Sequence, residues 1–243
     1  MKSISELAIK ICADGADKQT MLEMYRNPLI KGFTTNPSLL YKAGVKEYEA
    51  FARDILSVIQ DKPISFEVLS DDFKEMYEQA HRIADWGRNV YVKIPIVNTL
   101  GQSTIPLIEC LAREGIKQNV TAVMTLNQVH AAAVALRKSS AAIISVFAGR
   151  IADTGRDPMP VMREALEIMQ PFPQIELLWA SSREVFNIFQ AEEVGCHIIT
   201  MAHDLLKKLD NIGKDLEKFS LETVKLFFED ATKAGLILEE EYI

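Results

Sequence analysis

Lys93 lies near the end of a short apolar segment, NVYVKIP (89–95), and a lysine in that setting can bond covalently to a ketone. Side chains alternate along an extended segment, so Val92 and Ile94 share one side and Lys93 faces the other. Desolvation lowers the pKa of a lysine amine, which can then attack a carbonyl carbon. The resulting iminium withdraws electrons and makes a nearby carbon–carbon bond breakable. The sequence therefore predicts Schiff-base chemistry at Lys93.

Breaking that bond requires a base for the hydroxyl proton of the departing fragment. Asp14 follows the segment 8–13 and Glu67 lies in the segment 63–69, so either could serve. Thr121, in the segment 117–123, could help to hold a water molecule. The four histidines show no HxH or HExxH spacing and the three cysteines are scattered, so we expect no metal and no cofactor.

Two arginines follow later apolar segments and suit a phosphate group. Arg150 comes just after 141–147 and Arg183 just after 175–181, with Ser145 and Ser181 close by in sequence. Each arginine taken alone could equally form a salt bridge to a neighbouring carboxylate. For the pair together with two serines we favour a phosphate site.

Eight apolar segments alternate with amphipathic stretches along the chain. The expected strands are 8–13, 29–35, 63–69, 89–95, 117–123, 141–147, 175–181 and 196–201, and helical patterns include 47–60, 71–87 and 160–170. This alternation is typical of βαβ units and a parallel sheet. Eight units within 243 residues favour a closed (β/α)8 TIM barrel forming one domain, 1–243.

The segment that follows the last expected strand contains one more helix, at 220–235. We expect a C-terminal helical extension, about 209–243, that either caps the barrel or docks on a neighbouring subunit. The alternative fold is an open Rossmann-like sheet, which for a dinucleotide-binding protein would carry GxGxxG after its first strand. The first turn here reads DGADKQT, with a single glycine, which disfavours that fold.

Alternation along the strands predicts a polar set that faces the barrel interior. Its members lie in the C-terminal halves of their strands or just beyond: Asp14, Asn36, Glu67, Lys93, Asn119, Thr121, Ser145 and Ser181. The same reasoning places Leu178 and Ala180 outside and Trp179 inside, as a core side chain or a stacking surface. Active sites of such barrels lie at the C-terminal ends of the strands, so these residues form the candidate site.

Composition restricts the class of partner. The net charge is −7 and the pI about 5.3, which argues against a nucleic-acid-binding protein. A small anionic substrate remains compatible, because a few local arginines can hold one phosphate. No segment is long enough to cross a bilayer, no signal peptide is evident and cysteines are few, so we expect a cytoplasmic protein.

At these residues the sequence resembles the transaldolase family. Seven blocks occur in the order that the family shows: CADGAD (12–17), TTNPS (34–38), EV (67–68), VKIP (92–95), NVT (119–121), FAGR (147–150) and ASSRE (180–184). The resemblance implies a Schiff base at Lys93, general acid–base catalysis by Asp14, and handling of a catalytic water by Glu67 and Thr121. It implies that Asn36 and Asn119 bind hydroxyls of a dihydroxyacetone unit, with Thr35 and Phe147 also in the substrate-binding set. Ser145, Arg150, Ser181 and Arg183 would hold the sugar phosphate.

The family reaction moves a dihydroxyacetone unit from a ketose phosphate, such as sedoheptulose 7-phosphate or fructose 6-phosphate, to an aldose phosphate. The related fructose-6-phosphate aldolases release dihydroxyacetone instead and tend to carry glutamine at the position of Glu67 and tyrosine at that of Phe147. This chain therefore looks like the transferase. Gly15 and Ser182 depart from the usual pattern, which leaves open a divergent transaldolase of specialised sugar biosynthesis. A non-catalytic sugar-phosphate-binding barrel is the non-enzyme alternative.

Small members of the family often form pentamers or decamers, which implies a homo-oligomer.

Overall fold

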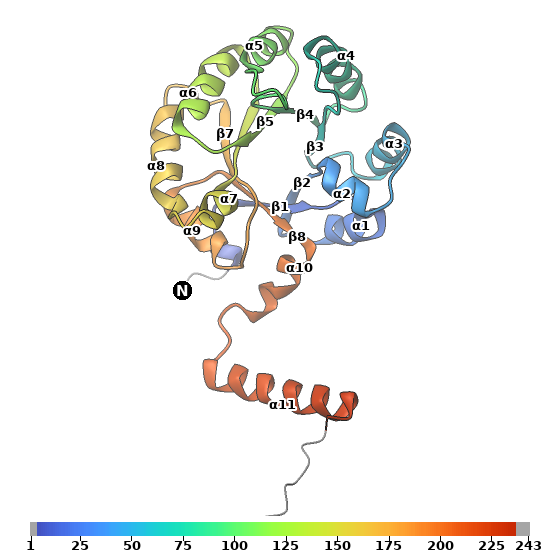
Figure 1. Cartoon of the computed structure of the whole chain (residues 1–243), viewed down its shortest axis with the longest axis vertical. Coiled ribbons are helices and arrows are strands. Elements are labelled where there is room, and N and C mark those ends of the chain that lie inside the picture. Colours follow the sequence, from blue (N-terminus) through green and yellow to red (C-terminus); the bar gives the residue numbers. More distant parts are fainter. Residues whose placement is uncertain (1–3, 237–243) are drawn as a thin grey trace, which may run out of the picture.

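The strands close into one parallel barrel in the order β1-β2-β3-β4-β5-β6-β7-β8. The computed structural model describes residues 4–236, and helices surround the barrel (Figure 1). The strands are β1 (Lys10–Asp14), β2 (Ile30–Thr34), β3 (Ile64–Glu67), β4 (Val90–Pro95), β5 (Gln118–Val123), β6 (Ala142–Val146), β7 (Ile175–Trp179) and β8 (Ile198–Ala202). The predicted TIM barrel with a C-terminal helix is confirmed, and each strand overlaps its predicted segment.

The α-helices follow the strands in the βα order that the sequence pattern predicts. They are α1 (Lys18–Arg26), α2 (Pro37–Lys42), α3 (Tyr48–Val58), α4 (Phe73–Ala84), α5 (Ile105–Arg113), α6 (Leu126–Ala135), α7 (Ala148–Asp153), α8 (Pro158–Met169), α9 (Asn187–Val194), α10 (His203–Leu206) and α11 (Leu216–Ala234). Short 3-10 turns occupy Ile4–Glu6, Leu136–Lys138 and Lys207–Asn211.

Polar side chains fix where several of these helices begin. The carboxylate of Asp72 accepts from the backbone N–H groups of Lys74 and Glu75 at the start of α4. Thr125 and Gln128 form a reciprocal capping box at the start of α6. Because such caps satisfy backbone donors that a helix leaves free, they set the points at which the loops into α4 and α6 end.

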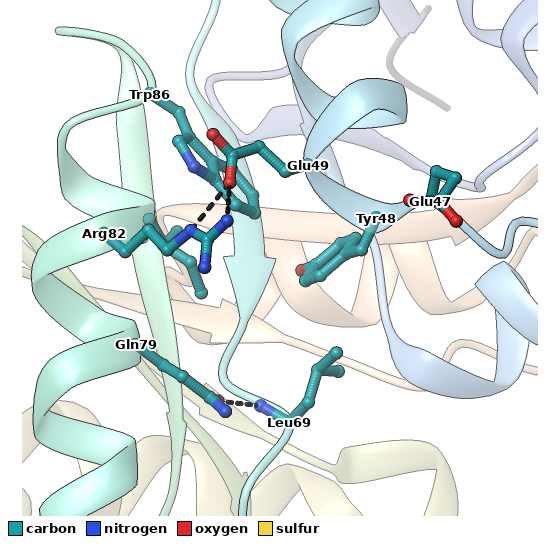
Figure 2. Close-up of a pocket in the computed structure, with 8 residues that line it drawn as sticks. Glu47, Tyr48, Glu49, Leu69, Gln79, Arg82 and Trp86 are labelled. Atoms are coloured by element: carbon teal, nitrogen blue, oxygen red, sulfur yellow. Dashed lines mark hydrogen bonds and ion pairs between the residues drawn. The ribbon is translucent and has the colours of Figure 1, made fainter.

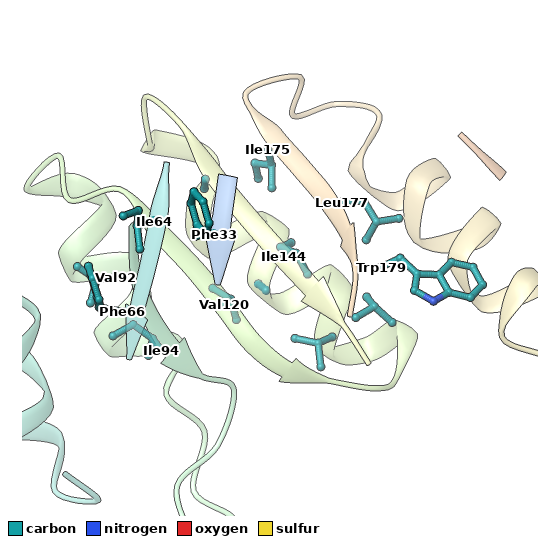
Figure 3. Packing of buried hydrophobic residues seen from close by; sticks show 14 of the residues in the cluster. Phe33, Ile64, Phe66, Val92, Ile94, Val120, Ile144, Ile175, Leu177 and Trp179 are labelled. Carbon is teal, nitrogen blue, oxygen red and sulfur yellow. The ribbon is translucent and has the colours of Figure 1, made fainter. Parts of the chain in front are cut away.

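The main hydrophobic core lies between the strands and the surrounding helices (Figure 3). Phe66, Val92 and Ile94 point outward into this layer, as alternation predicts, and all three are fully buried. A second, smaller cluster fills the barrel interior with Cys12, Ile143, Leu178, Ala180 and Ile198. These side chains occupy the interior and leave a small hollow of about 50 Å³ beside Cys12, Ile143, Leu178 and Ile198.

Alternation gave the wrong faces for β7. Trp179 packs in the outer layer (Figure 3), whereas Leu178 and Ala180 belong to the interior cluster. The register explains this, because Trp179 pairs with the outward Val146 of β6 and Leu178 pairs with the inward Ser145. The expectation that Trp179 lies inside the barrel is thus wrong.

The helix α11 extends the chain away from the barrel (Figure 1). None of its residues is buried, and several large apolar side chains are exposed along it: Leu216, Phe219, Leu221, Val224, Leu226, Phe227 and Phe228. Residues 237–243 of the predicted extension lie outside the described part of the chain. Between residues 4 and 236, no helix has both the length and the apolar character needed to span a bilayer.

Candidate active site

A cavity of about 460 Å³ opens at the C-terminal ends of the barrel strands. The residues that line it are Asp14, Thr34, Asn36, Pro37, Ser38, Leu39, Lys42, Glu67, Lys93, Asn119, Thr121, Ala122, Ser145, Phe147, Arg150, Ala180, Ser181, Arg183 and Thr200. All but one of the predicted site residues are among them. Thr35 is the exception.

Lys93 extends from β4 into the interior, where its amine has two neighbours. Nζ lies 3.0 Å from Oε2 of Glu67 and donates a 2.7 Å hydrogen bond to the backbone carbonyl of Thr35. Lys93 is buried and Glu67 is largely so. The pairing of Glu67 with Lys93 across β3 and β4 brings the two side chains to the same level of the barrel. A buried amine next to a carboxylate has a proton acceptor within reach.

Asp14 ends β1 and faces the same cavity. Burial raises the pKa of its carboxyl, and the charge of Lys93 and a hydrogen bond from Thr34 only partly oppose this effect. Thr34 Oγ1 donates to Asp14 Oδ1 at 2.7 Å and lies 2.6 Å from Thr200 Oγ1. Because the Thr34 proton is used by the carboxylate, Thr200 is the donor in the second hydrogen bond. A carboxyl whose pKa is raised above its usual range is a better proton acceptor when ionised and can return that proton later.

On β5, Asn119 and Thr121 have different surroundings. Asn119 donates to Ser65 Oγ at 3.0 Å and accepts from Ser145 Oγ at 2.6 Å, so its carboxamide orientation is fixed. Thr121 Oγ1 is buried and has no hydrogen-bond partner within the described chain. A buried hydroxyl normally has a partner, so Thr121 is available to a water molecule or a substrate hydroxyl. Ala122 has a φ of 60°, lies where the β5–β6 register shifts, and lines the cavity, although strict alternation from the inward Thr121 would place it outside.

The two arginines are not equivalent. Arg150, on α7, lies over the ring of Phe147 with its guanidinium carbon 5.7 Å from the ring centroid. It forms no ion pair with another residue of the described chain. Arg183 is bound by Asp153, to which both Nε and Nη2 donate. Both arginines line the cavity, but only Arg150 has a guanidinium that is not already paired.

Gly149 allows α7 to begin against the turn after β7. An added Cβ at this position would lie only 1.6 Å from the carbonyl oxygen of Ser181, and Gly149 N–H donates to the Ala180 carbonyl at 3.3 Å. Ser181 has a φ of 64°, a left-handed conformation that few non-glycine residues adopt. This turn brings Ser181 into the cavity, although Trp179, two residues earlier, faces outward. The start of α7, which carries Arg150, is thus packed directly against the turn after β7, which carries Ser181.

Some predicted substrate-binding residues are occupied by structural contacts. Thr35 is fully buried and its hydroxyl donates to the Ser65 carbonyl, so only its backbone carbonyl takes part in the site, through Lys93. Ser145 donates to Asn119, which makes it a support for Asn119. Asn36 also lines the cavity, and its Oδ1 atom caps α2 by accepting from Leu39 N–H at 3.0 Å, so the cap leaves its amide nitrogen unused.

Sequence reasoning did not identify Thr34, Thr200 or Lys42 as site residues. Thr200 alternates with the outward Ile199 and Met201 in CHIITM, which was a usable signal for an inward polar residue. Thr34 is the first residue of the TTNPS block, where the family resemblance implies roles only for Thr35 and Asn36. Lys42 lies on α2, beyond the strand, where alternation predicts nothing.

A second hollow lies outside the barrel, between α3 and α4 (Figure 2). Its volume is about 280 Å³, and its lining includes Tyr48, Arg82, Gln79 and Trp86. It shares none of its lining residues with the cavity that holds Lys93. Within residues 4–236, no three His, Cys, Asp or Glu side chains group in a way that could hold a metal ion.

Solved structures of known proteins share this architecture. A 2,3-dimethylmalate lyase matches with a TM-score of 0.54 and 10% identity over 99% of this chain and 89% of that one. KGPDC from Streptococcus mutans matches with a TM-score of 0.51 and 13% identity over 82% of this chain and 89% of that one. At such identities the likeness supports the barrel fold alone.

Sequence relatives are more informative. A "Probable transaldolase" of Thermoanaerobacter sp. (strain X514) is 31% identical over 94% of this chain and 99% of its own length. A "Probable transaldolase 2" of Listeria monocytogenes is 33% identical over 87% of this chain and 98% of its own. The family model described as Transaldolase/Fructose-6-phosphate aldolase matches residues 11–241. The chain therefore belongs to the transaldolase/fructose-6-phosphate aldolase family.

Proposed function

We propose that this protein is a transaldolase that transfers a dihydroxyacetone unit from a ketose phosphate to an aldose phosphate through a Schiff base at Lys93. The observation that carries the proposal is the buried amine of Lys93 in the cavity, 3.0 Å from Glu67 and in the same lining as Asp14 and Thr121. A buried lysine is costly unless it is paired or functional, and here it faces a cavity at the end where such barrels bind substrates.

The reaction begins when Glu67 accepts a proton from Lys93 Nζ, which frees the amine to attack the ketone carbon of the donor. The carbonyl oxygen takes up two protons, one from the attacking nitrogen and one that Glu67 returns, and leaves as water, so that an iminium remains on Lys93. Thr121, whose hydroxyl has no protein partner in the described chain, binds this water together with Glu67. Proton transfer by groups placed this closely contributes roughly 10²–10⁴-fold to a rate.

Asp14 then removes the proton of the hydroxyl on the carbon that becomes the aldehyde, which is the carbon of the breaking bond farther from the iminium. The electrons of that carbon–carbon bond move into the iminium, so an aldose phosphate departs and a three-carbon enamine stays on Lys93. The enamine attacks the aldehyde carbon of the acceptor, Asp14 returns the proton to the new hydroxyl, and water releases the product ketose. The raised pKa of Asp14 suits a group that must both take and give a proton.

The phosphate group is held at the turns after β6 and β7. Arg150 supplies the unpaired guanidinium, and Ser181, turned inward by its left-handed backbone, supplies a hydroxyl in the same lining. Arg183 contributes a charge that Asp153 already partly neutralises. We therefore assign the main phosphate contact to Arg150.

Group transfer is favoured over release by two side chains of the cavity. Glu67 and Phe147 both match the transferase pattern of the family, and Phe147 brings a ring without a hydroxyl to the lining. An enamine that meets no additional proton donor at this position persists until an aldehyde arrives.

Reduction with borohydride in the presence of fructose 6-phosphate tests the Schiff base. We expect a mass increase confined to the peptide that contains Lys93, and a folded protein that gives no adduct would refute the proposal. A parallel assay follows consumption of fructose 6-phosphate with and without erythrose 4-phosphate. Consumption that does not depend on the acceptor would assign the protein to the aldolase branch instead.

We also propose that α11 docks on a second copy of the chain in a homo-oligomer, of which a pentamer or decamer is the form expected. At about 100° per residue the exposed apolar side chains of α11 cover more than half of its circumference, and none is buried against the barrel of the same chain. The mass in solution, compared between the natural chain and a Phe227→Glu, Phe228→Glu variant, tests this. A monomeric natural chain would contradict it.

A further inference from the structure

The phenol of Tyr48 lies outside the barrel wall and contacts the backbone of a candidate catalytic residue from behind. Its hydroxyl accepts a 2.8 Å hydrogen bond from Glu67 N–H and donates a 3.1 Å bond to the Glu67 carbonyl. Tyr48 is the first residue of α3, and no sequence pattern marked it as part of the site. Both main-chain groups of Glu67 are thus bonded to one side chain.

The register between β2 and β3 shows what this contact replaces. Phe33 N–H donates to the Pro63 carbonyl at 2.8 Å, and Thr35 N–H donates to the Ser65 carbonyl at 3.2 Å. In a regular parallel ladder the next bond of this series would join Glu67 N–H to the Thr35 carbonyl. Glu67 N–H donates to Tyr48 instead, and the Thr35 carbonyl accepts from Lys93 Nζ at 2.7 Å.

We propose that Tyr48 is a positioning residue for Lys93: by taking over Glu67 N–H, it keeps the Thr35 carbonyl free to hold the amine. This inference rests on the proposed Schiff-base function. Without the phenol hydroxyl, the Glu67 amide would be a partly buried donor without its acceptor, which is costly. The nearest backbone acceptor in ladder geometry is the Thr35 carbonyl, so the amide would compete with Lys93 for it.

The packing around the ring fixes the hydroxyl in place. The ring of Tyr48 meets those of Phe66 and Trp86 edge-to-face, with centroids 6.2 Å and 5.3 Å away. Figure 2 shows Tyr48 beside Trp86 at the hollow between α3 and α4. Burial raises the pKa of the phenol, so the hydroxyl keeps its proton and can donate and accept together. These ring contacts do not need the hydroxyl, so phenylalanine preserves them.

The test compares Tyr48→Phe with the natural protein and with Tyr77→Phe. Tyr77 is the matched control because its hydroxyl donates to the exposed Glu114 at 3.1 Å, away from the barrel interior. Borohydride trapping of the Lys93 adduct is measured as a function of time at saturating fructose 6-phosphate, together with KM for this donor. We expect trapping in Tyr48→Phe to be about tenfold slower, the effect of one lost hydrogen bond to a charged group. KM should stay unchanged, because the phosphate contacts are untouched.

The outcomes separate the two proposals. Absence of an adduct in the natural protein refutes the proposed function, whereas equal trapping rates in Tyr48→Phe and Tyr77→Phe refute the role of Tyr48 alone. If Tyr48→Phe does not fold, the role of Tyr48 is tested by measuring hydrogen exchange of the Glu67 amide in the natural protein. Since Lys93 occupies the Thr35 carbonyl, Tyr48 is the acceptor that remains for the Glu67 amide. A protected Glu67 amide supports the role, and exchange at the rate of an unbonded amide overturns it.

Discussion

Lys93 and Glu67 face each other inside the barrel at 3.0 Å, on neighbouring strands and in paired register. Replacing Glu67 with glutamine keeps the shape of this pair but removes the proton acceptor. We expect borohydride trapping at Lys93 to slow by about tenfold or more in Glu67→Gln. Glu49→Gln is the control, since Glu49 pairs with Arg53 and Arg82 on the outer surface. An unchanged trapping rate would rule out proton acceptance by Glu67.

Asp14 and Lys93 act at different steps, so their loss should leave different adducts. In Asp14→Asn the amine still forms the iminium, but the carbon–carbon bond stays intact because no base removes the hydroxyl proton. We expect turnover to fall roughly 10²–10⁴-fold. Mass spectrometry of the reduced adduct should then find the whole fructose 6-phosphate on Lys93, where the natural protein also carries a three-carbon unit. A three-carbon adduct in the variant would assign the base to another residue.

The raised pKa of Asp14 also predicts how stability depends on pH. Because burial raises this pKa, the folded protein keeps the proton to a higher pH than the unfolded chain does. The contribution of Asp14 to the free energy of unfolding therefore falls as pH rises from about 4 toward the raised pKa. In Asp14→Asn this decline should be absent. Thermal unfolding of both proteins from about pH 4 to about pH 8 measures the difference, and parallel curves would contradict it.

Arg150 and Arg183 should differ in their effect on donor binding. Loss of a hydrogen-bonded charge costs about 1.5–3 kcal/mol, so Arg150→Ala should raise KM for fructose 6-phosphate by roughly 10–100-fold. Arg183→Ala should have a smaller effect, because Asp153 already engages that guanidinium. Arg156→Ala, outside the cavity lining, serves as the control. Equal effects of the first two variants would show that Asp153 releases Arg183 to the substrate.

Gly149 should tolerate no side chain. A methyl group there would overlap the Ser181 carbonyl, and overpacking of this kind costs about 1–3 kcal/mol or more. We expect Gly149→Ala to lower the urea midpoint of unfolding and to raise KM for the phosphorylated donor, since the turn that carries Ser181 must shift. Gly15→Ala is the matched control, because no atom lies within 4 Å of its added methyl. A Gly149→Ala protein as stable as the control would contradict the packing described here.

The sequence predicted the barrel well because each strand carries its own apolar signal. Alternation also predicted the inward faces of three residues near strand ends. These are Lys93 in β4, Glu67 as the last residue of β3 and Asp14 as the last residue of β1. Alternation failed on β7, where register with β6 sets the face of Trp179. It also does not contain the positive φ values by which the chain brings Ser181 and Ala122 into the cavity lining. Such backbone reversals arise from packing between turns, as at Gly149, and short-range patterns do not contain them.

The pairing of Arg183 with Asp153 could not be predicted for a similar reason. Arg183 was expected to serve a phosphate, with a neighbouring carboxylate as the alternative, and the structure shows the carboxylate contact. The two residues lie 30 positions apart, and only the packing of α7 against the turn after β7 brings them together. The proposed role of Tyr48 could not be predicted either. It depends on the absence of a backbone hydrogen bond between Glu67 N–H and the Thr35 carbonyl, which lie in segments other than that of Tyr48.

The amine of Lys93 is held by a carbonyl of the main chain at Thr35, and this affects how the site tolerates genetic variation. A backbone carbonyl is present whatever amino acid the codon specifies, so replacing the Thr35 side chain leaves this acceptor in place. A survey of single substitutions would register Thr35 as a packing position and miss its contact with the amine. Only changes that redirect the chain itself would remove this anchor.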